Sequence, residues 1–114
     1  MHEVAIALSL LKMVENKCQE VGYSSVESVK IRVGKASGVL PEAMQFAFEA
    51  VKRDSLAKNA QLVIDLVPAI GFCKACSSRF EWEAPYALEC PLCKSTSFQV
   101  FSGREMELVE IEVL

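Results

Sequence analysis

The sequence contains little of what enzyme active sites and membrane segments require. Among its 114 residues there is a single histidine, His2, and no glycine-rich loop of the kind that binds phosphate groups. No apolar run approaches the length needed to cross a bilayer, and the N-terminus lacks the basic region and small-residue cleavage site of a signal peptide. We therefore expect a cytoplasmic protein that is not an enzyme and has no membrane partner.

An excess of positive charge is also missing. Lys and Arg number 12 against 15 Asp and Glu, which gives a formal net charge of −3. Non-specific binding of nucleic acid depends on Lys and Arg that neutralise phosphates, so this balance argues against nucleic acid as a partner. What the chain does contain is apolar residues, which make up 52% of it and suffice for the core of one small domain with a compact insertion.

Residues 3–22 carry the first regular pattern. Apolar side chains recur there at the spacing of an amphipathic helix, and Gly22 supplies a C-terminal stop. The stripe consists of Val4, Ala7, Leu8, Leu11, Val14, Cys18 and Val21, widened by Ile6, Leu10 and Met13. Cys18 is therefore expected to be an inert cysteine of the core.

A strand, a second helix and two more strands follow. Residues 27–33 and 60–67 alternate between apolar and polar, and Pro41 suits the first position of a helix. The buried face of that helix is predicted to comprise Ala43, Met44, Ala47, Phe48, Ala50 and Val51. The strand over 60–67 should direct Ala60, Leu62, Ile64 and Leu66 to one side and end at Pro68. The last strand, 105–113, shifts its apolar phase near Leu108, which suggests a bulge.

Four of the five cysteines form two CxxC pairs, Cys73 with Cys76 and Cys90 with Cys93. Two residues between cysteines let a tight turn direct both sulfurs to one point, and two such turns make a tetrahedral site that suits Zn²⁺. Four protein ligands leave no open position, so the zinc would be structural. An Fe–S cluster could use the same ligands, whereas a redox dithiol would need only one pair.

The cysteine pairs lie in a segment where the regular periodicity stops. Between 69 and 103, cysteines, serines and prolines predominate, with short strand-like pieces at 79–82 and 98–101. We therefore predict an α+β fold of two helices on a three-stranded sheet, with an inserted zinc-ribbon subdomain. The first domain would span 1–68 plus 104–114, and the zinc-binding domain 69–103.

The first three residues offer a second set of metal ligands. A bulky second residue normally leaves the initiator methionine in place, so the mature chain should begin Met1-His2-Glu3. Its amine, backbone nitrogens and imidazole make a planar nitrogen set, which Ni(II) and Cu(II) favour. The first N–H groups of a helix have no intrahelical acceptor, so their deprotonation breaks no helical hydrogen bond. The alternative is that His2 is simply a solvated side chain.

Four segments together resemble one family. The Met-His-Glu start, the SGVxPEAMxFAFEA segment at 37–50, the two CxxC pairs and the closing GxExELxxIEV strand at 103–113 are similar to the HypA/HybF family. Its members are nickel metallochaperones of [NiFe]-hydrogenase maturation. The resemblance spans the chain in the right order. It implies that transported nickel is bound by the Met1 amine, His2 and the Glu3 amide, and that structural zinc is bound by Cys73, Cys76, Cys90 and Cys93.

The resemblance also implies partners and shows one departure. The family's usual partners are a nickel-handling GTPase and the hydrogenase large-subunit precursor, and some members serve urease. Some relatives carry an acidic side chain in the turn before the second helix, where this chain has Leu40. Glu42 is near, but beyond Pro41. The sequence leaves the oligomeric state open between monomer and homodimer.

A zinc ribbon that binds nucleic acid or a transcription partner is the alternative function. The charges of the cysteine-rich segment cancel, so no basic surface is evident. They are Lys74, Arg79 and Lys94 against Glu81, Glu83 and Glu89. Its aromatic residues, Phe80, Trp82 and Tyr86, could stack on bases but are expected to form the small core of the segment.

Overall fold

A computed structural model describes residues 2–83 and 89–113. The described chain divides into two compact units, and each is considered by itself. The first comprises the residues up to Ile31, Leu40–Asp65 and the residues from Glu107 onwards, and the second comprises Arg32–Val39 and Leu66–Met106. Among the helices of the described residues, none has the length and apolar character that a bilayer crossing requires.

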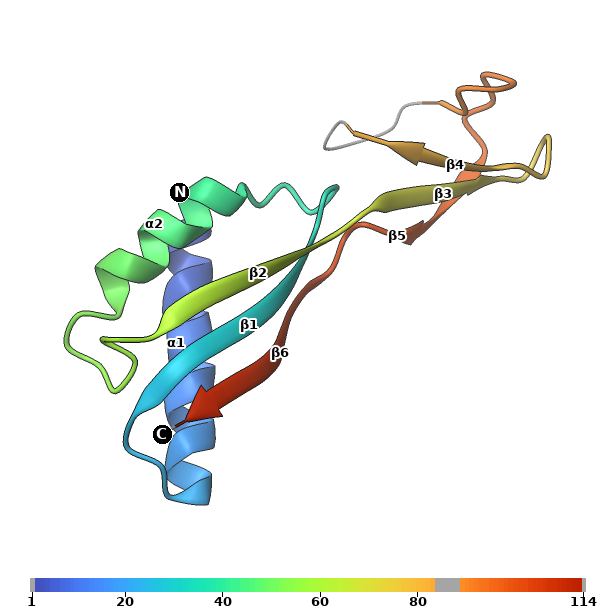
Figure 1. Ribbon diagram of the computed structural model, residues 1–114. Helices are drawn as coiled ribbons and strands as arrows, with labels where there is room; N and C mark the ends of the chain where they lie inside the picture. Colours follow the sequence, from blue (N-terminus) through green and yellow to red (C-terminus); the bar gives the residue numbers. More distant parts are fainter. Residues whose placement is uncertain (1, 84–88, 114) are drawn as a thin grey trace. The chain divides into compact units, whose positions relative to one another are not determined.

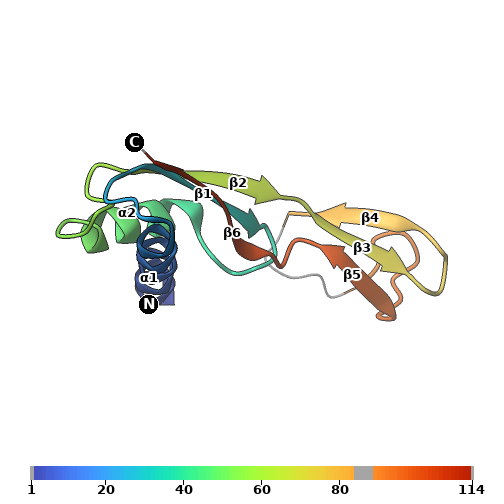
Figure 2. The ribbon, with the colours of Figure 1, turned by 90° about the horizontal axis from the view of Figure 1, so that it is seen from below.

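The described elements alternate between helix and strand before the chain becomes entirely β. In order they are α1 (His2–Val21), β1 (Val26–Gly34), α2 (Pro41–Val51), β2 (Gln61–Val67), β3 (Ala69–Cys73), β4 (Arg79–Trp82), β5 (Phe98–Ser102) and β6 (Met106–Val113). One sheet has the strand order β2-β1-β6 and the other β4-β3-β5. Figures 1 and 2 show both helices on the same face of the first sheet. The predicted α+β class is confirmed.

Helix α1 buries one side along its length. The buried residues are Glu3, Ala7, Leu10, Leu11, Val14 and Cys18. Cys18 is thus a core residue, as predicted. The prediction was wrong for Leu8, Met13 and Val21, which are all exposed. At 3.6 residues per turn, Leu8 and Met13 lie well off the buried line, one on each side of it, and Val21 lies beyond the last buried turn.

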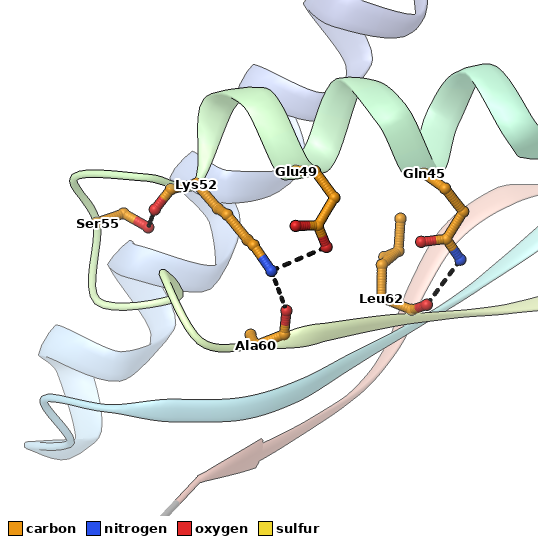
Figure 3. Close-up of polar contacts among 6 residues, drawn as sticks. All are labelled: Gln45, Glu49, Lys52, Ser55, Ala60 and Leu62. Atoms are coloured by element: carbon orange, nitrogen blue, oxygen red, sulfur yellow. Dashed lines mark hydrogen bonds and ion pairs between the residues drawn. The ribbon is translucent and has the colours of Figure 1, made fainter.

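Helix α2 buries a narrower face than the sequence indicated. Met44, Ala47 and Phe48 are buried, but Ala50 is exposed, so its prediction was wrong. Ala50 shares its side of the helix with Phe46, which is largely exposed. Two long polar side chains, one on α2 and one at its C-cap, reach β2 and the residue before it (Figure 3). Gln45 Nε2 donates to the carbonyl of Leu62 at 2.8 Å, and Lys52 Nζ donates to that of Ala60 at 2.7 Å.

The first sheet is built around β1, whose Val29, Ile31 and Val33 have no exposed surface. Strand β2 follows the predicted alternation only in part, because Leu66 is exposed and Val67 is buried instead. The predicted burial of Leu66 was therefore wrong. The reason is that the chain passes from the first unit into the second after Asp65. From there on, the other side of the strand faces the core, so Val67 is buried in place of Leu66.

Strand β6 changes its burial phase where the sequence does. Leu108 is half-buried, Val109 and Glu110 are both exposed, and Ile111 is half-buried again. Two exposed residues in succession break the simple alternation of a strand. A bulge at this point stays a prediction.

The second unit is a small antiparallel sheet. Strand β3 pairs with β4 and with β5, and its register with β5 shifts between Ile70 and Gly71. On one face, Phe80 packs with Cys73 and Cys90, and the partly buried Trp82 and Phe98 join them. The expectation that Phe80 and Trp82 form the core is confirmed, while Tyr86 lies outside the described residues.

A close approach of two glycines lies where β1 ends in the second unit. Gly34 N–H donates to the carbonyl of Glu105 at 2.7 Å, and Ala36 N–H donates to that of Gly103 at 2.6 Å. A Cβ at Gly34 would lie 2.0 Å from the Gly103 carbonyl oxygen. Gly103 itself has φ +111, a conformation that other residues rarely adopt. Both positions therefore require glycine.

Candidate metal centres

The second unit brings the four predicted cysteines together. Their Sγ atoms all lie within 4.8 Å of one another, with Cys73 to Cys93 at 3.5 Å and Cys76 to Cys90 at 3.8 Å. Four sulfurs bonded to one Zn²⁺ at about 2.3 Å in a tetrahedron are about 3.8 Å apart. The sulfur arrangement therefore fits a tetrahedral zinc ion at its centre.

Two turns with the same backbone pattern present these sulfurs. In the first, Cys73 N–H donates to the Ser78 carbonyl at 2.8 Å, and Ser77 N–H donates to the Cys73 carbonyl at 2.9 Å. In the second, Cys90 N–H donates to the Ser95 carbonyl and Lys94 N–H to the Cys90 carbonyl, both at 2.8 Å. Ser77 and Lys94 have φ of 58° and 65°. The repeated left-handed residue closes each turn after its second cysteine, so the two turns are local duplicates.

The electrostatics of the cluster indicate a need for positive charge. The backbone N–H of Cys76 is the main cause that lowers the pKa of Cys73. The backbone N–H of Ser95 favours the thiolate of Cys93, but hydrogen bonds with the other three sulfurs, together with desolvation, raise its pKa to about 12. Within the cluster the thiolate form is therefore favoured at Cys73 and disfavoured at Cys93. A divalent cation among them would let all four become thiolates, which is the form that binds metal.

The burial of the cluster is uneven. Cys73 and Cys90 are buried against the aromatic core, whereas Cys76 and Cys93 are exposed. Phe80 and Phe98 meet edge to face with ring centroids 5.6 Å apart, and Trp82 lies 5.7 Å from Phe80. The first cysteine of each pair is therefore part of the unit's core, and the second closes the site on the solvent side.

The other predicted site lies at the start of α1. The side chain of His2 is 66% exposed, and its Nε2 lies 3.8 Å from Glu3 Oε2. Because α1 begins at His2, the backbone N–H groups of His2 and Glu3 belong to the first turn and have no intrahelical acceptor. The imidazole and both amide nitrogens are thus available from one short stretch. Met1 lies outside the described residues.

The side chain of Glu3 has a role that sequence reasoning missed. It is only 7% exposed, and its Oε2 accepts a hydrogen bond from the backbone N–H of Leu40 at 3.3 Å. This N–H is the main cause that lowers the pKa of Glu3. Leu40 is the N-cap of α2 and offers no side-chain cap of its own, so the carboxylate supplies negative charge where the helix dipole favours it. Glu3 therefore fixes the start of α1 against the start of α2.

The hydrogen bond between Leu40 and Glu3 joins residues 37 positions apart, so the periodic pattern of the sequence could not predict it. The only local signal was the acidic residue in the first turn of α1. The side chain of Leu40, at the position where some relatives are expected to carry an acidic group, is exposed. Position 40 thus contributes through its backbone, which any residue except proline would supply.

Comparison with known proteins gives one consistent family. Residues 1–113 match the family model described as hydrogenase/urease nickel incorporation, metallochaperone, hypA. Among curated proteins, the chain is 40% identical over 114 residues to hydrogenase maturation factor HypA of Picosynechococcus sp., with all of both chains covered. It is 37% identical over 113 residues to the factor of the same name from Albidiferax ferrireducens, with 99% of each chain covered.

Solved structures agree with the sequence comparison. The chain resembles the solution structure of the Ni metallochaperone HypA from Helicobacter pylori, with a TM-score of 0.70 and 30% identity, over 100% of this chain and 98% of that one. A second solution structure of HypA protein gives a TM-score of 0.71 at 30% identity, over 100% and 97%. The likeness therefore extends over the whole chain.

Proposed function

Because the chain belongs to the HypA family of nickel metallochaperones for hydrogenase maturation, we propose that it binds Ni²⁺ at its N-terminus and transfers the ion to a maturation partner. The observation that carries this proposal is the start of α1. His2, the only histidine of the chain, is solvent-exposed there beside two backbone nitrogens of a first helical turn.

The ligands proposed for nickel are the Met1 amine, the amides of His2 and Glu3, and the His2 imidazole. Nitrogen donors of these kinds suit the planar geometry of Ni(II). The Glu3 carboxylate is occupied by the Leu40 N–H at 3.3 Å, so it positions the first turn rather than binding the metal. A site at a chain end can open without unfolding a core, which suits an ion that must be handed on.

The four cysteines are proposed to bind structural Zn²⁺. The spacing of the sulfurs and the two duplicated turns support zinc, and a site closed by four protein ligands has no position for substrate. We propose that residues 69–103 form the zinc-binding domain and depend on the ion for folding, and that 1–68 with 104–114 form the nickel-binding domain.

The proposed partners are a nickel-handling maturation GTPase and the hydrogenase large-subunit precursor, with urease maturation as a further role. The protein catalyses no reaction in this proposal, and it acts in the cytoplasm. Nucleic acid is not favoured as a partner, because two cations of the second unit already have partners within the chain. Arg79 stacks on Phe101, with the guanidinium carbon 5.0 Å from the ring centre, and Lys35 pairs with Glu83 at 3.5 Å.

The test is a calorimetric titration of untagged, zinc-loaded protein with Ni²⁺. We expect one nickel per chain, and loss of that binding in His2→Ala. The matched control is Asn16→Ala, an exposed position on the same helix, which should bind nickel as the unchanged protein does. Binding that is unchanged by His2→Ala would refute the N-terminal site. Zinc content is measured in each sample, so that a loss of nickel caused by unfolding of the second unit is recognised.

A further inference from the structure

An apolar groove lies in the first unit, between the C-terminal half of α1 and β6. Its cavity volume is about 450 Å³. Met13, Val21, Tyr23 and Val109 line it, and each is roughly half exposed. Single exposed apolar residues are common on protein surfaces, but several gathered around one groove mark an interaction site.

The groove runs beside an edge strand. In the sheet β2-β1-β6, β6 has β1 on one side and no strand on the other among the described residues (Figure 1). Such an edge presents N–H and C=O groups to which an extended chain can add. The opposite edge differs, because Gln45 of α2 and Lys52, its C-cap residue, donate to carbonyls of β2 and of the residue before it (Figure 3). Strand β6 is therefore the more open edge.

The charge of β6 decides what can add to it. Lys17 of α1 and Glu110 of β6 both line the groove, and Glu112 is exposed farther along β6, so the edge carries two exposed carboxylates against one ammonium group. Pairing of β6 with β6 of a second copy would bring two net acidic edges together, which is unfavourable. A strand that alternates apolar and basic residues would instead satisfy both the groove and the edge.

We propose that the groove between α1 and β6 binds an extended segment of a partner protein in which basic residues alternate with apolar ones. The segment adds to the sheet outside β6. Its apolar side chains pack against Val21 and Val109, and its basic side chains meet Glu110 and Glu112. This binding involves neither candidate metal site. A failure of peptide binding would therefore leave the nickel proposal unaffected, and a failure of nickel binding would leave this proposal unaffected.

The test is a fluorescence-anisotropy titration of the zinc-loaded full chain with a labelled acetyl-KVKIKVK peptide. We expect one peptide per chain, with amide shifts in NMR spectra confined to residues 13–23 and 106–113. The peptide KVKPKVK keeps the charge, but proline cannot donate a ladder hydrogen bond, so it should bind about tenfold more weakly. Glu110→Lys should weaken KVKIKVK about fivefold, because an attractive exposed pair becomes repulsive.

The matched control is Asp54→Lys, which makes the same charge change at an exposed turn outside the groove. It should leave binding unchanged. Equal weakening by both variants, or equal binding of both peptides, would show unspecific charge attraction and overturn the proposal. Shifts that map to β2 would overturn it as well. A dimer in sedimentation that Glu110→Lys abolishes would assign the groove to a second copy instead.

Discussion

The two candidate metal sites are specified in opposite ways. In the second unit, four side chains converge because two identical backbone turns aim them, and two of the sulfurs belong to the core. At the start of α1, most of the proposed ligands are main-chain nitrogens, and a single long-range hydrogen bond from Leu40 to Glu3 fixes the first turn. A closed site suits an ion that maintains structure, and an open chain end suits an ion that is exchanged.

The largest effect should come from breaking the closed site. Cys90→Ser removes one thiolate and takes a buried sulfur from the aromatic core. Because metal binding and folding are coupled in small zinc units, we expect loss of bound zinc and unfolding of the second unit. Metal analysis and NMR spectra measure the two effects. The control is Cys18→Ala, which lies in α1 and should keep one zinc per chain. Full zinc content in Cys90→Ser would show that the ligand set is wrong.

A smaller effect should come from the glycine contact in the second unit. In Gly34→Ala the new Cβ would lie 2.0 Å from the Gly103 carbonyl oxygen, so backbone must move. We expect a loss of about 3 kcal/mol in the free energy of unfolding, measured with denaturant. Gly38→Ala is the control, since nothing lies within 4 Å of its added Cβ and only its φ of +83 is strained. Equal losses in the two variants would contradict the close approach.

A still smaller effect is expected at Glu3. Glu3→Gln keeps the shape and the backbone amide but removes the negative charge that accepts the Leu40 N–H. We expect a loss of about 1 kcal/mol in stability, typical of a weakened charged hydrogen bond. Nickel stoichiometry should remain at one, because the proposed ligand is the amide. Glu27→Gln, at an exposed position of β1, serves as the control and should change neither quantity. Loss of nickel in Glu3→Gln alone would make the carboxylate a ligand.

Features that depend on local sequence could be predicted from it. The CxxC turns are set by a few consecutive residues, and the structure brings all four cysteines together as expected. The helix that begins at Pro41 and the central strand around Ile31 follow from local periodicity in the same way. Local pattern was also enough to place Cys18 in the core.

The remaining features depend on contacts between distant residues. The sequence does not predict strand β3, because Pro68 indicates the end of a strand, whereas the chain resumes as a strand at Ala69 in another sheet. A proline only removes one N–H and fixes φ, so it permits such a change of partner. The Glu3–Leu40 bond and the change of inward side at Leu66 likewise depend on the three-dimensional arrangement, which one-dimensional periodicity does not contain.

Nickel is proposed to bind through the free end of the chain, and acetylating the amine of Met1 tests this best. Acetylation leaves every side chain in place, including His2 and the four cysteines, and turns the amine into an amide without adding a new amine to the chain. We predict that the acetylated protein keeps one zinc and its thermal stability and loses high-affinity Ni²⁺ binding in calorimetry. An unchanged nickel affinity after acetylation would show that the free amine is not a ligand.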